Sequence, residues 1–226
     1  PDWSRGLGDV YKRQFDKQTV FLPPSGRMHP KMQREWFIEK IVVKSAPAIY
    51  RIFYCLFNQQ HKVKLMPFST LSLSSELIHA LPKDFKEPTD IQALAIPELL
   101  SGKDVLALAN TGSGKTLAYG LPLLEKLSVN PEQKALILVP TRELATQVSE
   151  AINQVGQAIG LNAVCLCGGV DKELQLQALA ADPKILVATT GRLVDLANNG
   201  LDLSNIHYLV LDEADRLLDM GFWPDM

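Results

Sequence analysis

Short apolar runs alternate with longer amphipathic segments over the later two-thirds of the chain. The apolar runs lie between turn-forming residues and cover 105–109, 135–139, 163–166, 185–188 and 208–211. Helical spacing of apolar residues occupies the intervening segments, at about 115–128, 142–159, 171–180 and 191–198. Strands that are apolar on both faces and alternate with helices indicate a parallel sheet covered on both sides. The pattern therefore predicts an α/β fold.

Two more helices are predicted before the first of these strands. Ser74 or Ser75 can cap a helix that continues to about Leu81. Thr89 precedes a second helical pattern over 90–100, which ends at a Ser-Gly pair.

Composition places the chain among globular proteins. Of its 226 residues, 46% are hydrophobic and 21% are charged, which argues against general disorder. Three cysteines are too few for a disulfide scaffold and fit a reducing, cytoplasmic location. No uncharged apolar run reaches membrane-spanning length, so we expect no membrane partner. Cys165 and Cys167 are poor zinc ligands by themselves, and strand packing explains them better.

The net charge of -2 conceals two unlike parts. Residues 1–65 hold 12 basic and 5 acidic side chains, whereas residues 66–226 hold 11 basic and 20 acidic ones. The first part begins with Pro1 and lacks clear periodicity over 1–14. We expect 1–65 to be a leader of doubtful nativeness, disordered or irregular. The alternative is a basic helix within 31–57 that meets RNA or a membrane surface.

A glycine-rich segment follows the first predicted strand and opens a helix. Its sequence, from residue 109 to 116, is Ala-Asn-Thr-Gly-Ser-Gly-Lys-Thr, and we call it the phosphate loop. Gly112 and Gly114 let successive N–H groups face a polyphosphate, at the positive end of the helix dipole. Lys115 can reach the β- and γ-phosphates, and the Thr116 hydroxyl can bind Mg²⁺. This strand–loop–helix order predicts a nucleotide site.

One position departs from the general pattern of such loops. Ala109 stands where the pattern has glycine, five positions before Gly114. The alternative interpretation is a glycine turn followed by a surface lysine.

The last apolar run ends in the acidic sequence Asp212-Glu213-Ala214-Asp215. An aspartate at the carboxyl end of a buried strand lies at the edge where such sheets bind ligands. Asp212 can therefore hold Mg²⁺, directly or through water, and Glu213 can accept a proton from an attacking water. The alternative is a helix that simply begins with acidic residues, which the helix dipole favours.

Together these segments resemble the DEAD-box family of ATP-dependent RNA helicases. The likeness covers 66–226 and rests on the phosphate loop, on Asp212 to Asp215, and on Pro140-Thr141-Arg142-Glu143-Leu144-Ala145. It implies the first RecA-like P-loop domain of such a helicase. The expected activity is ATP binding and hydrolysis with Mg²⁺, coupled to RNA binding and local duplex unwinding. Catalysis would rest on Glu213, Asp212 and Lys115.

The resemblance also implies which residues hold the nucleotide. Gln92 would read the adenine edge as part of a Q motif, and Phe68 would stack near the base. The alternative for Gln92 is a solvated helix residue. Asp84 and Asp90 replace the family's usual Gly and Pro, which affects the turn before the helix. The implied nucleotide ligands are Phe68, Phe85, Gln92, Ala109, Thr111, Gly112, Ser113, Gly114, Lys115, Thr116 and Asp212.

RNA contacts are implied at three segments that read the nucleic-acid backbone. In the third, Thr190 replaces the family's usual proline. Threonine can cap a helix, and we expect weakened preorganisation of this segment but no loss of function. Asp215 would couple this domain to a second one. The implied RNA ligands are Pro140, Thr141, Arg142, Gly168, Gly169, Thr190, Gly191 and Arg192.

The sequence ends soon after the acidic motif, before the family's Ser-Ala-Thr motif. We expect a fragment that lacks the second RecA-like domain, binds nucleotide weakly, shows little RNA-stimulated ATPase and unwinds nothing alone. Two other functions stay open. One is a non-catalytic, ATP-gated RNA clamp, and the other is a DNA-directed helicase of superfamily 2.

Overall fold

The computed structural model describes residues 39–45, 52–55 and 66–220, which belong to one compact unit beginning at Ile38. The alternative of a basic helix within 31–57 is wrong for 39–45 and 52–55, which form strands, and the rest of that range lies outside the described residues. Within them, no helix is both long enough and apolar enough to cross a membrane.

A seven-stranded sheet forms the centre of the described unit, in the order β2-β3-β1-β7-β4-β6-β5. The strands predicted from the apolar runs are all present, and β4, β5, β6 and β7 pair in parallel as expected. Each observed strand begins or ends within two residues of its prediction. These strands are β3 (Asp104–Ala109), β4 (Lys134–Val139), β5 (Ala163–Leu166), β6 (Ile185–Thr189) and β7 (Ile206–Leu211).

Two further strands come from the basic leader. β1 (Glu39–Ser45) lies between β3 and β7 and runs antiparallel to both, and β2 (Ile52–Cys55) pairs in parallel with β3. The prediction of an irregular leader is wrong for these two stretches, and the sheet is mixed at β1. The stretches are rich in β-branched and aromatic residues, which favour strands even without alternation. The nativeness of 1–65 and a domain boundary at 66 stay predictions.

Helices connect the strands and begin close to their predicted starts. The Ser74 hydroxyl accepts a bond of 3.3 Å from the Leu77 N–H and caps the first α-helix, and Thr89 forms a capping box with Gln92 at the second. The helices are η1 (Phe68–Thr70), α2 (Ser75–Ala80), α3 (Asp90–Leu100), α4 (Lys115–Val129), α5 (Arg142–Gly156), η2 (Gln157–Ile159), α6 (Lys172–Ala180), α7 (Thr190–Asn198) and α8 (Ala214–Asp219).

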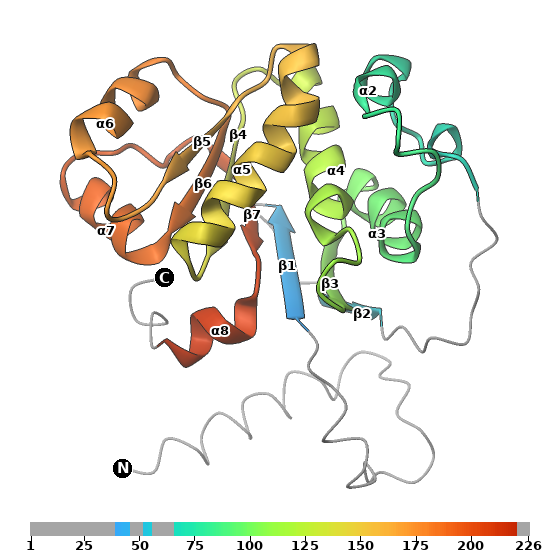
Figure 1. The fold of residues 1–226 in the computed structure, drawn as a ribbon, viewed down its shortest axis with the longest axis horizontal. Helices are drawn as coiled ribbons and strands as arrows, with labels where there is room; N and C mark the ends of the chain where they lie inside the picture. Colours follow the sequence, from blue (N-terminus) through green and yellow to red (C-terminus); the bar gives the residue numbers. More distant parts are fainter. Residues whose placement is uncertain (1–38, 46–51, 56–65, 221–226) are drawn as a thin grey trace, which may run out of the picture. The chain divides into compact units, whose positions relative to one another are not determined.

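Alternate residues of the buried strands pack into two separate cores, which confirms helices on both faces of the sheet. In β4, Ile137 and Val139 belong to the core under α3, α4 and α5. Leu136 and Leu138 belong to the opposite core, which α7 and α8 cover through Leu196 and Leu217. Figure 1 shows α4 and α5 passing in front of the strands, with α3 beside α4.

The topology brings the predicted site segments to one edge of the sheet. Because β1 is antiparallel to both neighbours, β3 and β7 run in the same direction, and β4, β5 and β6 run parallel to β7. All five therefore end at the same edge, which is where open α/β sheets bind ligands. The phosphate loop, the acidic motif and the three RNA-binding segments each follow one of these strand ends.

Candidate active site

The phosphate loop connects β3 to α4 and folds around its own lysine. Lys115 is the first residue of α4, and its side chain is buried, at 8% exposed. Its Nζ donates to the carbonyl oxygens of Ala109 at 2.9 Å and Asn110 at 3.4 Å. This burial does not fit the alternative of a surface lysine. The ammonium is instead held inside the loop whose N–H groups would face a polyphosphate.

Gly114 precedes α4 in a left-handed conformation and packs tightly against Gln92. Its φ is +88°, and a Cβ placed there would lie 2.6 Å from Gln92 Nε2. Gln92 Nε2 donates to the Gly114 carbonyl at 3.0 Å, while Gln92 Oε1 accepts from the Thr89 N–H at 2.9 Å. The glutamine is 1% exposed, so the alternative of a solvated residue is wrong. Gln92 holds the start of α3 against the phosphate loop, and adenine recognition stays a prediction.

The two phenylalanines of the predicted base site differ in exposure. Phe68 is 3% exposed and belongs to the core with Leu71 and Leu77. Phe85 is 39% exposed, in the loop before α3. Base stacking by Phe68 stays a prediction, and it would require the ring to become accessible.

Asp212 is a buried carboxylate with a hydrogen bond to each oxygen. It is 3% exposed, and its backbone N–H donates to the Leu138 carbonyl at 2.9 Å, which holds it beside β4. Oδ2 accepts from the Tyr119 hydroxyl at 2.9 Å, and Oδ1 accepts from the Glu213 N–H at 3.0 Å. Burial raises the pKa of Asp212, while the Tyr119 hydrogen bond and the Lys115 charge act to lower it. A fixed carboxylate therefore lies within the electrostatic reach of the phosphate loop.

The residues after Asp212 make the turn into α8. Glu213 has a φ of +50°, a left-handed conformation that costs an ordinary residue roughly 1–2 kcal/mol. Its carboxylate accepts a bond of 2.9 Å from Arg216, and its side chain is 13% exposed. Asp215 Oδ1 is buried without a hydrogen-bond partner among the described residues. The general-base role of Glu213 and the coupling role of Asp215 stay predictions.

The three predicted RNA-binding segments meet at the loop after β5. Arg142 Nη1 donates to the Gly168 carbonyl at 3.5 Å, and Arg192 Nη2 donates to the Val170 carbonyl at 3.1 Å. Gly169 has a φ of +78°, and a Cβ placed there would lie 2.1 Å from Arg142 Nη1. We call residues 167–170 the glycine-pair loop. The structure thus brings the two arginines to one backbone segment, at the exposed edge of the sheet.

Caps differ between the helices of this surface. The Thr141 hydroxyl accepts a bond of 3.2 Å from the Leu144 N–H and caps α5. At α7 the cap position is Thr189, whose side chain makes no cap bond, and Thr190 is the buried first residue of the helix. No threonine side chain caps α7, because Thr190 lies inside the helix and Thr189 makes no cap bond, and the weakened preorganisation of this segment stays a prediction.

The cysteine pair lies at the end of β5. Cys165 Sγ and Cys167 Sγ are 3.9 Å apart, and both side chains pack against the core under α4 and α5. Burial raises the pKa of Cys165 to about 11. Across the described part of the chain, no cluster of three or more metal-ligating side chains is present.

Two residues of the site escaped the sequence analysis. Tyr119 bonds Asp212 from α4, and Gln175 Nε2 donates to the Cys167 carbonyl at 2.9 Å, which fixes the start of the glycine-pair loop. Tyr119 lies three residues after Thr116, on the same helix face. This position beside a predicted metal ligand was the signal that could have identified it. Gln175 offered no comparable signal, because its partner is remote backbone.

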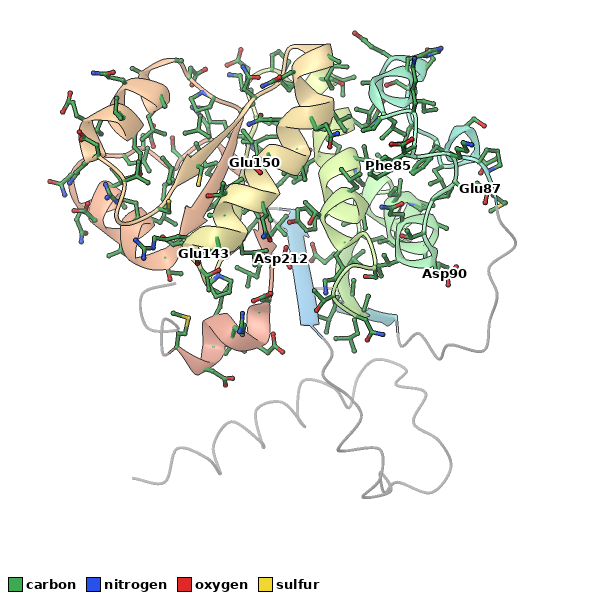
Figure 2. All side chains as sticks on the ribbon, in the orientation of Figure 1. Phe85, Glu87, Asp90, Glu143, Glu150 and Asp212 are labelled. Carbon is green, nitrogen blue, oxygen red and sulfur yellow. The ribbon has the colours of Figure 1, made fainter. Side chains whose placement is uncertain are left out.

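Figure 2 shows how the site is distributed along the sheet edge. Asp90 at the start of α3, Glu143 at the start of α5 and Asp212 after β7 lie at about the same level in this view, near the carboxyl ends of the strands. Helix starts and strand ends therefore share one edge, as a phosphate-binding α/β domain requires.

The fold and this edge define a RecA-like domain of the P-loop class. The family model described as DEAD/DEAH box helicase matches residues 89–226, more than half of the chain. The chain therefore belongs to the DEAD/DEAH box helicase family.

Curated relatives agree with this family. The chain is 46% identical over 167 residues to the ATP-dependent rRNA helicase RRP3 of Debaryomyces hansenii, covering 72% of this chain and 35% of that protein. It is 50% identical over 163 residues to the ATP-dependent RNA helicase DeaD of Buchnera aphidicola, covering 70% and 27%. The chain thus spans about a third of the length of these relatives.

Solved structures show the same domain. A DEAD box protein from the hyperthermophile Methanococcus jannaschii matches with a TM-score of 0.63 and 39% identity, over 72% of this chain and 46% of that one. The RNA-helicase Prp28 from Chaetomium thermophilum, bound to ADP, matches with a TM-score of 0.64 and 34% identity, over 80% and 43%.

Proposed function

We propose that this chain is the ATP-binding domain of an ATP-dependent RNA helicase. The observation that carries the proposal is the buried pair of opposite charges at the sheet edge. Lys115 sits inside the phosphate loop, and the charge of Lys115 acts on Asp212 at the end of β7. A buried cation and carboxylate at that edge suit a nucleotide phosphate with its divalent cation.

The donor set fits Mg²⁺. Thr116 is half-buried and Asp212 is buried, and their hydroxyl and carboxylate are hard oxygen ligands at the edge of the sheet where we propose that the phosphates bind. Bound Mg²⁺ would neutralise charge on the β- and γ-phosphates. Lys115 would stabilise the charge that develops during transfer, and Glu213 would accept the proton of the attacking water. To reach that water, the Glu213 carboxylate must leave Arg216, which it contacts at 2.9 Å.

RNA binding is proposed at the other end of the same edge. The arginines of α5 and α7 converge on the glycine-pair loop, where exposed backbone amides and two guanidinium groups can meet phosphates. The relatives whose printed names include RNA helicase support this choice of partner over DNA. A contact to the ribose 2′-hydroxyl would distinguish RNA from DNA as the partner, because DNA lacks this group.

Unwinding and rapid hydrolysis are proposed for a longer protein. The chain covers about a third of its curated relatives, and the second RecA-like domain would supply the arginines that complete the ATP site. An arginine finger contributes about 10³–10⁵ in rate in related phosphoryl transfer. We propose that the 226-residue chain alone has little RNA-stimulated ATPase and that it works in the cytoplasm. If Glu213→Gln in the whole protein abolishes ATP hydrolysis, the protein is a catalyst and not a non-catalytic clamp.

The test of the nucleotide site is a titration of the chain with a fluorescent ADP analogue and Mg²⁺. Lys115→Ala should abolish measurable binding, because no other described cation lies inside the phosphate loop. The matched control is Lys184→Ala, which removes an ammonium paired with Asp182 at 2.7 Å at the opposite end of the sheet. Equal affinity in Lys115→Ala and Lys184→Ala would overturn the proposed function.

A further inference from the structure

Tyr119 places a phenol hydroxyl in the interior of the proposed metal site. The side chain is 1% exposed and comes from the second turn of α4. Its hydroxyl donates at 2.9 Å to Oδ2 of Asp212, the residue that follows β7. A hydroxyl at this depth must have a partner, since an unpaired one costs about 1–3 kcal/mol. Here the partner is the carboxylate assigned to Mg²⁺.

The second proposed metal ligand lies on the same helix as Tyr119. Thr116 stands three residues before Tyr119 in α4, so the two side chains are neighbours on one helix face. The bond from the Tyr119 hydroxyl to Asp212 therefore joins the helix that carries Thr116 to the strand end that carries Asp212.

We propose that Tyr119 is a positioning residue that sets the distance and orientation between Thr116 and Asp212, and thereby the Mg²⁺ affinity of the site. The inference rests on the proposed function and adds a residue to its metal site. Asp212 has two oxygens, and the Glu213 N–H and the Tyr119 hydroxyl each hold one. Together these two bonds fix the rotation of the carboxylate. Outer partners of this kind typically change metal affinity by about 10–100-fold when removed.

Core packing is the competing explanation for Tyr119. A buried aromatic ring on α4 fills the core between the helix and the sheet whether or not its hydroxyl matters. The Tyr119→Phe change separates the two roles, because it keeps the ring and removes the oxygen. Tyr208→Phe is the matched control, since the Tyr208 hydroxyl donates to Gln133 Oε1 at 2.8 Å, at the amino end of β7.

The measurement is binding of a fluorescent ADP analogue to the 226-residue chain as a function of Mg²⁺ concentration. Tyr119→Phe should raise the half-saturating Mg²⁺ concentration about tenfold or more. Its affinity for the analogue in EDTA should stay that of the wild type. Tyr208→Phe should match the wild type in both conditions. A purely structural role would instead weaken binding equally with and without Mg²⁺, and that result overturns the inference.

A second measurement uses the unaltered tyrosine. Adding Mg²⁺ to the nucleotide-bound wild-type chain should shift its tyrosine ultraviolet absorption, because the Tyr119 hydroxyl donates to the proposed metal ligand Asp212, and Tyr208→Phe should keep the shift. If the tyrosine absorption does not shift at Mg²⁺ concentrations that saturate nucleotide binding, the proposed role of Tyr119 is contradicted. If the wild-type chain binds no nucleotide in Mg²⁺, the proposed function has failed. If it binds but Tyr119→Phe has the wild-type Mg²⁺ dependence, only the inference has failed.

Discussion

The proposed nucleotide site and the proposed RNA surface share one sheet edge but are built differently. Around the phosphate loop, the functional side chains are buried and hydrogen-bond to neighbouring groups of the site, and Gln92, Lys115 and Asp212 are 1%, 8% and 3% exposed. Around the glycine-pair loop, Arg142 is exposed and Arg192 only half-buried, and both bond to backbone carbonyls. The nucleotide site is built from buried side chains, whereas the RNA surface is built from side chains that are exposed or half-buried.

This difference sets what each site can recognise. A buried site whose side chains are held by hydrogen bonds fixes the positions of a few charges, which suits one small ligand with a metal ion. An exposed loop flanked by guanidinium groups contacts a long polyanion with little demand for base identity. Changes at the nucleotide site should therefore cost stability together with function. Changes at the RNA surface should cost affinity alone.

The largest effect is expected from Gly114→Ala. The new Cβ would lie 2.6 Å from Gln92 Nε2, in a backbone with φ of +88°, so the start of α4 must shift. Nucleotide binding should fall below detection and the free energy of unfolding by about 1–3 kcal/mol. The control is Gly102→Ala, where φ is +82° but no atom lies within 4 Å of the new Cβ. Titration and thermal melts of both variants measure the contrast, and wild-type nucleotide affinity in Gly114→Ala would refute it.

A moderate effect is expected from Arg142→Ala and Arg192→Ala. Each change should weaken binding to single-stranded RNA several-fold regardless of sequence, because the lost contacts are to phosphates. Each should also reduce the salt slope of RNA affinity by about one, with thermal stability unchanged. Lys184→Ala removes the same charge at the other end of the sheet and should leave both quantities alone. If the salt slope of RNA affinity is unchanged in both arginine variants, the RNA binds at another surface.

The smallest functional effect is expected from Gln92→Ala. Its carboxamide bonds Thr89 and Gly114, so its loss leaves a buried N–H and a carbonyl unpaired and lowers stability by about 1–3 kcal/mol. If the amide also reads adenine, the preference for ATP over GTP should erode. Competition of both nucleotides against the fluorescent analogue measures that preference. An unchanged preference in a folded variant would limit Gln92 to its structural role.

The features that could be predicted from the sequence depend on residues close together in the chain, and the features that were missed depend on contacts between distant residues. The short apolar runs, the glycine-rich loop and the Ser74 cap were readable because each depends on a few adjacent residues. The bond from Tyr119 to Asp212 was not, since it joins residues 93 positions apart. β1 was missed for a related reason. An apolar stretch interrupted by Lys44 has no clean period, and its strand form depends on β3 and β7 as neighbours.

The most direct test of the account measures nucleotide and RNA binding in the same pair of glycine variants. In Gly169→Ala, the new Cβ would lie 2.1 Å from Arg142 Nη1 and displace that flexible side chain, while the phosphate loop is untouched. The account predicts that Gly114→Ala loses ADP binding and keeps nucleotide-free RNA binding. It predicts that Gly169→Ala keeps ADP binding and weakens nucleotide-free RNA binding several-fold. Proportional loss of both ligands in both variants would contradict two separate sites on one edge.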